Sequence, residues 1–196
     1  MTLTLTIIAV LLLLDLLGWH WLLGRAIRRD PPPCSVPETW PSVSVVRPIK
    51  GADTGQAENL AAALGHEYPG EVETIFVFDD EQDPGYAGAE RAIRDHESSG
   101  RPGRALLITC GAPPANRTGK LHAMIVGAEH ATGELLAFGD SDTRPDPGLL
   151  RTLVSTLLAD DRTACTFAPA VVVGRLRTAG DVGYAMMLNA LYGSVA

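Results

Sequence analysis

ELLAFGDSDTRPDP, residues 134–147, is the stretch that decides the fold. Its apolar first part, which ends at Phe138, has the length and composition of a buried β-strand, and Asp140 and Asp142 follow almost at once. The proline-rich residues that come next are typical of a turn that leads into a helix. A strand, a turn with carboxylates and a helix in this order are the repeating unit of an α/β protein with a parallel sheet.

The same alternation continues on both sides of this stretch. Short apolar runs of strand length are separated by helical patterns, which indicates a largely parallel sheet. The predicted strands are 42–47, 73–78, 105–109, 134–138 and 165–173, and the predicted helices are 57–64, 86–96, 120–131, 147–158 and 182–191. The sequence therefore predicts an α/β, Rossmann-like and mostly parallel domain over residues 42–196.

The composition narrows the function classes before any motif is considered. The chain has 196 residues, 46% of them hydrophobic and 20% charged, and its net charge is −7. These values exclude a disordered chain and a disulfide-rich miniprotein. Because nucleic-acid binding needs a basic face that neutralises phosphates, the acidic balance predicts no nucleic-acid partner. The 3 cysteines lie far apart in the sequence and indicate neither a disulfide framework nor a zinc site.

Residues 1–29 form a separate N-terminal region. The stretch from Leu3 to Leu23 is almost continuously apolar, and several arginines follow it. About 20 such residues, rising about 1.5 Å each as a helix, span a hydrocarbon core of about 30 Å. Asp15 opposes insertion, but the surrounding leucines offset it. We therefore expect a transmembrane helix that anchors the chain in a membrane.

A cleaved signal peptide and a buried core helix are the alternatives to this anchor. A signal peptide carries its positive charge before a shorter apolar run, whereas here the arginines come after the run. Arginines on that side favour a single-pass protein with its N-terminus outside and its domain in the cytoplasm. Residues 30–41, DPPPCSVPETWP, are too rich in proline for a helix and predict a semi-rigid spacer.

The candidate site lies at the carboxyl ends of the predicted strands, because parallel α/β sheets bind their ligands there. The sequence places Pro48 after the first strand, Asp79 and Asp80 after the second, and Asp140 and Asp142 after the fourth. Two aspartates one residue apart can present oxygens to Mg²⁺ or Mn²⁺, whose shell a diphosphate completes. The alternatives are an ordinary turn with a helix cap for the later pair and a solvated acidic loop for the earlier one.

Two cationic residues lie where a loop enters a predicted helix. Arg117 and Lys120 are in NRTGKLHA, and cationic side chains beside the free N–H groups of a helix start favour phosphate. Ordinary helix-start residues are the alternative. Neither a phosphate loop of the G-x-x-x-x-G-K-[ST] type nor a G-x-G-x-x-G dinucleotide fingerprint is present in the sequence.

Four segments in order, SVSVVRPIKG, FVFDDEQDP, NRTGKLHAMIVGAEH and ELLAFGDSDTRPDP, resemble family 2-type glycosyltransferases with a GT-A fold. Within that family the chain looks most like the branch of ceramide glucosyltransferase-like and hopanoid-associated glycosyltransferases. The resemblance covers roughly residues 41–173, and it implies a GT-A nucleotide-sugar-binding domain behind an N-terminal membrane helix.

The resemblance also implies roles for single residues. Asp80 would contact the uridine of the donor, and Lys120 would lie in the donor-binding region beside Pro48. Asp140 and Asp142 would hold the diphosphate and a Mg²⁺ or Mn²⁺ ion. The implied reaction transfers a hexose or N-acetylhexosamine from a UDP-sugar to a lipid hydroxyl, ceramide- or hopanoid-like, with inversion.

The C-terminal part departs from the family pattern. The family's catalytic base is an aspartate of a later segment, and a Gln/Arg-x-x-Arg-Trp motif follows it. Here no tryptophan follows Trp40, and Asp181 is the only acidic residue after Asp161. We therefore expect an incomplete domain that is truncated at its C-terminus, with unknown catalytic residues. The alternative is a non-catalytic, membrane-tethered protein that binds sugar nucleotides, or a truncated pseudo-enzyme.

Overall fold

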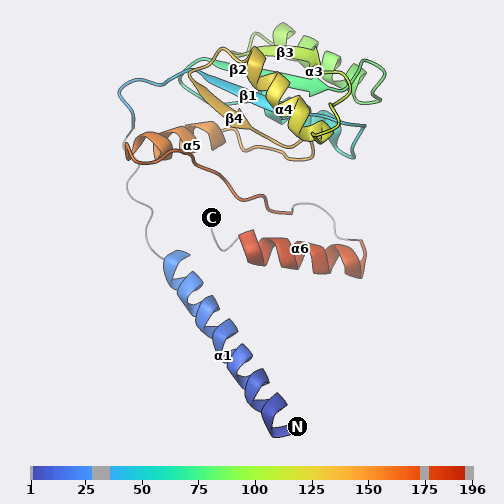
Figure 1. Ribbon diagram of the computed structural model, residues 1–196. Coiled ribbons are helices and arrows are strands. Elements are labelled where there is room, and N and C mark those ends of the chain that lie inside the picture. The colour runs from blue at the N-terminus through green and yellow to red at the C-terminus, as the bar shows by residue number, and fades with distance from the viewer. Residues whose placement is uncertain (1, 28–35, 173–176, 193–196) are drawn as a thin grey trace. The chain divides into compact units, whose positions relative to one another are not determined.

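The computed structural model describes residues 2–27, 36–172 and 177–192, which fall into two compact units. Unit 2, Ser35–Thr166, is the α/β domain, and Figure 1 shows its sheet and helices. Unit 1 comprises Met1–Cys34 and Phe167–Ala196 and contains two helices, α1 (Thr2–Ile27) and α6 (Ala179–Tyr192).

Four strands form the sheet of unit 2, in the spatial order β3-β2-β1-β4. Their bounds are β1 (Val43–Pro48), β2 (Val72–Phe78), β3 (Arg104–Thr109) and β4 (Leu135–Phe138). All three pairings are parallel, so Val46 of β1 lies opposite Ile75 of β2 and Phe138 of β4. The strand order reverses at β1, and ligands of open parallel sheets bind beyond the carboxyl ends at such a reversal.

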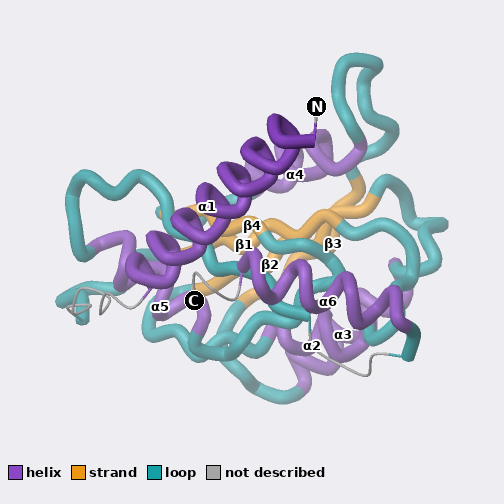
Figure 2. Tube along the Cα trace, turned by 90° about the horizontal axis from the view of Figure 1, so that it is seen from below, coloured by secondary structure: helices purple, strands orange, loops and turns teal. Residues whose placement is uncertain are grey.

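Helices cover both faces of this sheet, as Figure 2 shows. On one face lie α2 (Gln56–Leu64), α3 (Tyr86–Ser98) and α5 (Leu149–Leu158), which pack on alternate residues of β1 and β2 such as Val45 and Phe76. On the other face α4 (Gly119–His130) packs on Val46, Ile75 and Val77. Because β1 and β2 are covered on both faces, successive apolar residues such as Val45 and Val46, or Ile75 and Phe76, are buried on opposite faces.

The edge strand β4 is covered less completely than its neighbours. Val46, which lies opposite Phe138, is fully buried under α4, whereas Phe138 itself is 50% exposed and Leu136 is 49% exposed. These two side chains belong to the face that α4 covers, and α4 packs on β1 and β2 rather than on β4. The sheet therefore ends in a short strand with an apolar face open on one side.

The structure confirms the parallel α/β architecture and all four strands up to residue 138, with small differences at the ends. The fifth predicted strand, 165–173, is wrong over its described part, because residues 165–172 have no regular secondary structure. A strand needs a hydrogen-bonded neighbour, and no further strand pairs with β4 among the residues described. Phe167 and Val171, whose composition favoured a buried strand, are 76% and 49% exposed.

Unit 1 does not bear out the predicted transmembrane helix of residues 1–29. The apolar residues form α1, in which Leu12 and Trp19 are 64% and 65% exposed. In the described part of the chain, however, no helix has the length and apolar character that crossing a membrane requires. Residues 28–35, with the arginines behind the helix and most of the predicted spacer, lie outside the described residues.

The other helix of unit 1, α6, begins a few residues before its predicted start. The Asp181 side chain accepts hydrogen bonds from the backbone N–H groups of Arg177 and Thr178, and Thr178 Oγ1 accepts one from the N–H of Asp181. This reciprocal capping satisfies donors that a helix start leaves free, and it moves the beginning of the helix toward Thr178.

Candidate functional site

A cavity of about 270 Å³ lies at the carboxyl ends of β1, β2 and β4, where the fold places a ligand. Its lining combines carboxylates, lysines and the start of a helix: Pro48, Ile49, Lys50, Asp53, Asp79, Gly119, Lys120, Ala123, Asp140, Ser141 and Asp142. Of the seven candidate residues that the sequence offers, five are among them, and Asp80 and Arg117 are not.

Asp79, and not Asp80, faces the cavity. The Asp79 side chain is 24% exposed, and its Oδ2 lies 2.8 Å from Nζ of Lys50. Asp80 is exposed, and its Oδ1 accepts a hydrogen bond from the backbone N–H of Gln82 at 2.8 Å. Successive side chains of a strand point to opposite faces, so only one residue of an adjacent pair can continue toward the α4 side. The role of Asp80 in uridine binding stays a prediction.

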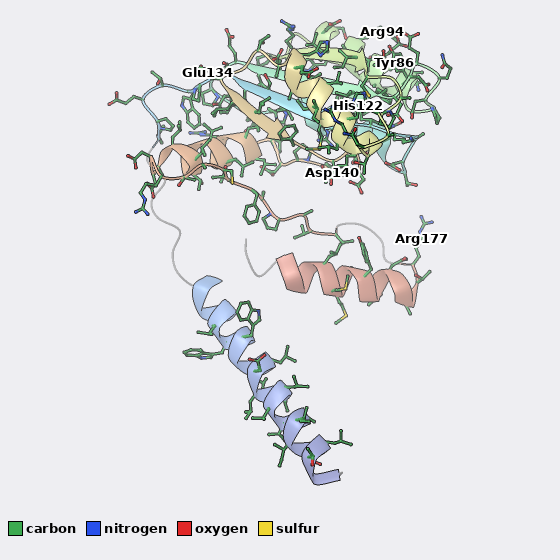
Figure 3. All side chains as sticks on the ribbon, viewed as in Figure 1. Tyr86, Arg94, His122, Glu134, Asp140 and Arg177 are labelled. Atoms are coloured by element: carbon green, nitrogen blue, oxygen red, sulfur yellow. The ribbon has the colours of Figure 1, made fainter. Side chains whose placement is uncertain are left out.

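Lys120 lies at the start of α4 and pairs with Asp140, with 2.5 Å between its Nζ and Oδ1. The helix begins there because the Thr118 side chain accepts a hydrogen bond from the N–H of Leu121. Figure 3 labels Asp140, which lies beside this helix start. Both partners are more than half exposed, so the pair contributes at most about 1 kcal/mol to stability. The pair is important for ligand binding because it places a cationic side chain and the N–H groups of a helix start together at the cavity.

The loop between β1 and α2 brings the second lysine to the site. Gly51 has a φ of 79°, a backbone conformation that L side chains rarely adopt. Its N–H donates to the two carboxylate oxygens of Asp83 at 2.8 and 3.1 Å, and its carbonyl accepts from Gln56 Nε2 at 3.0 Å. These contacts fix Lys50 next to Asp79, and the hydrogen bond with Asp79 raises the pKa of Lys50.

A buried arginine lies beneath the two aspartates that follow β4. Arg47, on β1, is 3% exposed and donates to the backbone carbonyls of Asp140 and Thr143. Burial lowers the pKa of Arg47 to about 10, while the charges of Asp140 and Asp142 raise it. The guanidinium therefore stays protonated at neutral pH. Sequence reasoning missed this residue, and the available signal was a lone charge within the buried run SVSVVR.

Arg117, the other predicted cation, does not line the cavity. Its side chain is exposed, and its backbone N–H donates to the carbonyl of Pro114 at 3.0 Å. Lys50 takes its place as the second cationic side chain at the site.

Asp140 and Asp142 fit a hard divalent cation in the manner of Mg²⁺ or Mn²⁺. Both carboxylates are exposed to the cavity, and Asp142 makes no ion pair with a described residue. No group of three or more His, Cys, Asp and Glu side chains is placed to hold a metal ion in the described residues. Mg²⁺ commonly takes one or two carboxylates and completes its shell with substrate phosphates and water. Two carboxylates beside two lysines suit a cation that arrives with a diphosphate.

A second and larger cavity, of about 570 Å³, lies at the amino ends of the strands. Its buried carboxylate, Glu73, accepts hydrogen bonds from Ser44 Oγ at 2.6 Å and Thr132 Oγ1 at 2.9 Å. Burial raises the pKa of Glu73, but these hydrogen bonds and the charge of Arg104 outweigh burial and hold the pKa below its ordinary value. Glu73 thus links β1, β2 and the turn before β4, which is a structural role.

Comparison with known proteins gives a family match over most of the chain. Residues 4–191 match Glycosyl transferase family 21. No protein among those with curated descriptions matches.

Two solved structures show a likeness to this chain, and the likeness extends to the fold for the first of them. One is the mannosyltransferase PcManGT from Pyrobaculum calidifontis in complex with GDP-Man and Mn²⁺, with 25% identity and a TM-score of 0.53 over 74% of this chain. The other is TarS from S. aureus, with 21% identity and a TM-score of 0.42 over 57% of this chain and 30% of that one. The chain spans 40% of the PcManGT structure.

Proposed function

The chain belongs to Glycosyl transferase family 21, and from this we propose that it binds a UDP-sugar with Mg²⁺ or Mn²⁺ at the carboxyl-end cavity of unit 2 and serves sugar transfer to a lipid hydroxyl. The observation that carries the proposal is the meeting of five charged groups from four segments. Asp140 and Asp142 follow β4, Lys120 begins α4, and Lys50 and Asp79 follow β1 and β2.

The charges at this cavity suit the two halves of a nucleoside diphosphate–cation complex. Asp140 and Asp142 would hold the cation, which supplies neutralisation of the charge that grows on the leaving diphosphate. The positive charges of Lys120 and Lys50 would stabilise the negative charge of the diphosphate. The backbone N–H groups at the start of α4 would stabilise it further. In the free protein each lysine is paired with an aspartate, while Asp53 and Asp142 also line the cavity, so the lining is net negative and favours a cation that arrives with the donor.

The acceptor side of the reaction needs a base that takes the proton of the acceptor hydroxyl. Among the described residues we assign this role to none. We therefore propose that unit 2 binds and orients the donor. The base that the inversion at the anomeric carbon requires would come from outside this donor site. Ceramide- and hopanoid-like lipids are the acceptor class that the sequence resemblance favours.

A lipid acceptor suits the exposed apolar helix of unit 1. Along the described part of α1 almost every large side chain is exposed, and most of these are Leu and Ile. Burying apolar surface in a lipid phase is favourable by roughly 25 cal/mol per Å². We place the chain at a membrane surface, with α1 as the attached element and unit 2 on the cytoplasmic side.

Titration calorimetry of the full chain with UDP, with and without Mn²⁺, tests the donor site. We expect binding that requires Mn²⁺, and we expect Asp142→Asn to weaken it at least about tenfold, which corresponds to about 1.4 kcal/mol. The matched control is Asp161→Asn, an exposed aspartate beyond α5 that does not line the cavity. Equal binding by wild type and Asp142→Asn, or no binding by a folded wild type, would contradict the proposal.

A turnover measurement separates a transferase from a protein that only binds sugar nucleotides. UDP release that needs both Mn²⁺ and a lipid acceptor supports the transferase. Mn²⁺-dependent UDP binding without any release favours the non-catalytic alternative.

A further inference from the structure

Arg47 occupies an unusual place for a charged residue. It lies near the carboxyl end of β1, the central strand at which the sheet order reverses, and it is 3% exposed. Its guanidinium points along the sheet toward β4, where an added Cβ on Gly139 would lie 3.5 Å from Nη1. Burying a charged group is costly unless hydrogen bonds compensate, so its partners show what the burial serves.

Those partners all belong to a single loop, and two of them are backbone carbonyls. Arg47 Nη2 donates to the carbonyl of Asp140, to the carbonyl of Thr143 at 2.8 Å and to Thr143 Oγ1 at 3.3 Å. The loop also closes on itself, since Thr143 Oγ1 donates to the Asp140 carbonyl at 2.7 Å and the N–H of Thr143 approaches it at 3.3 Å. The Asp140 carbonyl is therefore the point where the loop's own hydrogen bonds and the Arg47 hydrogen bond converge.

A second buried polar residue holds the same loop from the side of α2. Asn59 is 6% exposed, its Oδ1 lies 3.4 Å from Nε of Arg144, and its Nδ2 lies 3.5 Å from the carbonyl of Ser141. These contacts are longer than those of Arg47 and are correspondingly weaker. Arg47 thus supplies the short hydrogen bonds to this loop, and Asn59 of α2 adds longer ones.

We infer that Arg47 is a positioning residue: by holding the backbone of residues 140–143, it sets the direction of the Asp140 and Asp142 carboxylates for the cation and the diphosphate. This inference rests on the proposed function of the cavity. Arg47 itself does not line the cavity and acts through the loop. The two carboxylates stand on exposed loop residues, and without such a support each would sample many directions at an entropic cost to binding.

The geometry separates this positioning role from a purely electrostatic one. All three hydrogen bonds come from Nη2 of Arg47, so a lysine at position 47 keeps the positive charge and can donate to one or two of the carbonyls, but its ammonium group does not occupy the same position. A methionine has a similar length and no donor. If Arg47 acted through its charge alone, Arg47→Lys would equal wild type, whereas positioning predicts an intermediate effect.

Two readouts test the inference in the full chain. Hydrogen exchange of the peptide containing residues 139–145, without ligand, reports how firmly the loop is held. Electron paramagnetic resonance of Mn²⁺ in the presence of UDP reports occupancy of the site. Supporting residues behind metal ligands commonly change affinity about 10- to 100-fold, so we expect Arg47→Met to accelerate the exchange and to weaken Mn²⁺–UDP binding at least about tenfold. Arg47→Lys should restore part of both.

Matched variants keep the test decisive. Arg94→Met, an exposed arginine on α3 labelled in Figure 3, makes the same substitution away from the site and should leave both readouts at the wild-type level. If Arg47→Met does not fold, Thr143→Val decides, because it removes an acceptor of Arg47 and a donor to Asp140 without removing a buried charge. Wild-type exchange and wild-type binding in the folded Arg47 or Thr143 variant would overturn the inference. Absence of Mn²⁺–UDP binding in wild type would overturn the proposed function, and the exchange measurement would still show whether Arg47 holds the loop.

Discussion

At the scale of single residues, His66 shows how the buried polar groups of unit 2 couple its stability to pH. Both ring nitrogens of His66 are buried and have no hydrogen-bond partner among the described residues. Burial, followed by the positive charge of Arg47, lowers the pKa of His66 to about 4 from an ordinary value of 6.5. The neutral ring is thus the form that the fold accepts.

The pH dependence follows from the direction of this shift. Between pH 4 and 6.5 the unfolded chain binds more protons at His66 than the folded chain, so the free energy of unfolding rises with pH in this window. The contribution is complete above pH 6.5, is lost as the pH falls toward 4, and amounts to at most about 3 kcal/mol. Urea unfolding of wild type and His66→Phe at several pH values measures it. A pH slope that is unchanged in the variant would contradict the assignment.

The charged residues also show how far sequence reasoning reaches at this scale. Asp140, Asp142 and Lys120 were predictable because strand ends and helix starts collect ligand-binding groups. The sequence alone does not distinguish Asp79 from Asp80 as the residue that lines the cavity. The distinction requires the sheet face toward which each side chain points, and this follows from how β2 sits in the sheet. A lone charge within a buried run marks Arg47 as unusual, but its role could not be predicted, because only the loop after β4 supplies its partners.

At the scale of elements, Gly127 determines how closely α4 approaches the sheet. A Cβ at this position would overlap Cγ1 of Val46 and would lie 3.0 Å from Cγ2 of Val77. We expect Gly127→Ala to lower the free energy of unfolding by about 1–3 kcal/mol through overpacking, although alanine is the better helix former. It should also weaken Mn²⁺–UDP binding, because Lys120 moves with α4.

Chemical unfolding and titration calorimetry measure the two effects of this substitution. The control is Gly183→Ala in α6, where an added Cβ meets no atom within 4 Å and no loss of stability is expected. A Gly127→Ala protein as stable as wild type would show that α4 can shift without cost.

The elements themselves were largely predictable, and the exception has a physical cause. Strands β1 to β4 are short runs of apolar residues between turn signals, so composition alone locates them. Residues 165–173 have a similar composition, but residues 165–172 have no regular structure. A strand forms only where a neighbouring strand accepts its hydrogen bonds, and composition does not reveal whether such a neighbour exists. The resemblance to glycosyltransferases is confirmed, although the family that matches is family 21 and not family 2, and the ceramide- and hopanoid-related branch stays a prediction.

At the scale of the whole molecule, unit 2 contains its own hydrophobic core. The three clusters of buried apolar residues all lie between positions 40 and 154, within Ser35–Thr166. We expect the fragment 35–166 to unfold in one cooperative transition and to bind Mn²⁺–UDP within about threefold of the full chain, since the cavity belongs entirely to this unit.

We expect unit 1, and not unit 2, to attach the chain to membranes. In flotation with phosphatidylcholine vesicles, the full chain should rise with the lipid and the fragment 35–166 should stay behind, because α1 carries the exposed apolar side chains. Flotation of the fragment, or a fragment that melts without cooperativity, would contradict this division of roles.

The strand order has a further consequence for the nascent chain. Strand β1 lies between β2, which follows it closely in the sequence, and β4, which comes much later. The side chains of Ser42, before β1, and Glu134, before β4, form a hydrogen bond across a separation of 92 residues. At about 5–20 residues per second, the ribosome delivers that second neighbour about 5–18 s later. During this interval one edge of β1, a buried strand of the finished sheet, has no partner and is open to pairing with other chains. The hydrogen bonds of Arg47 form only at the end of it, so the donor site is completed only after the loop that follows β4 has been made.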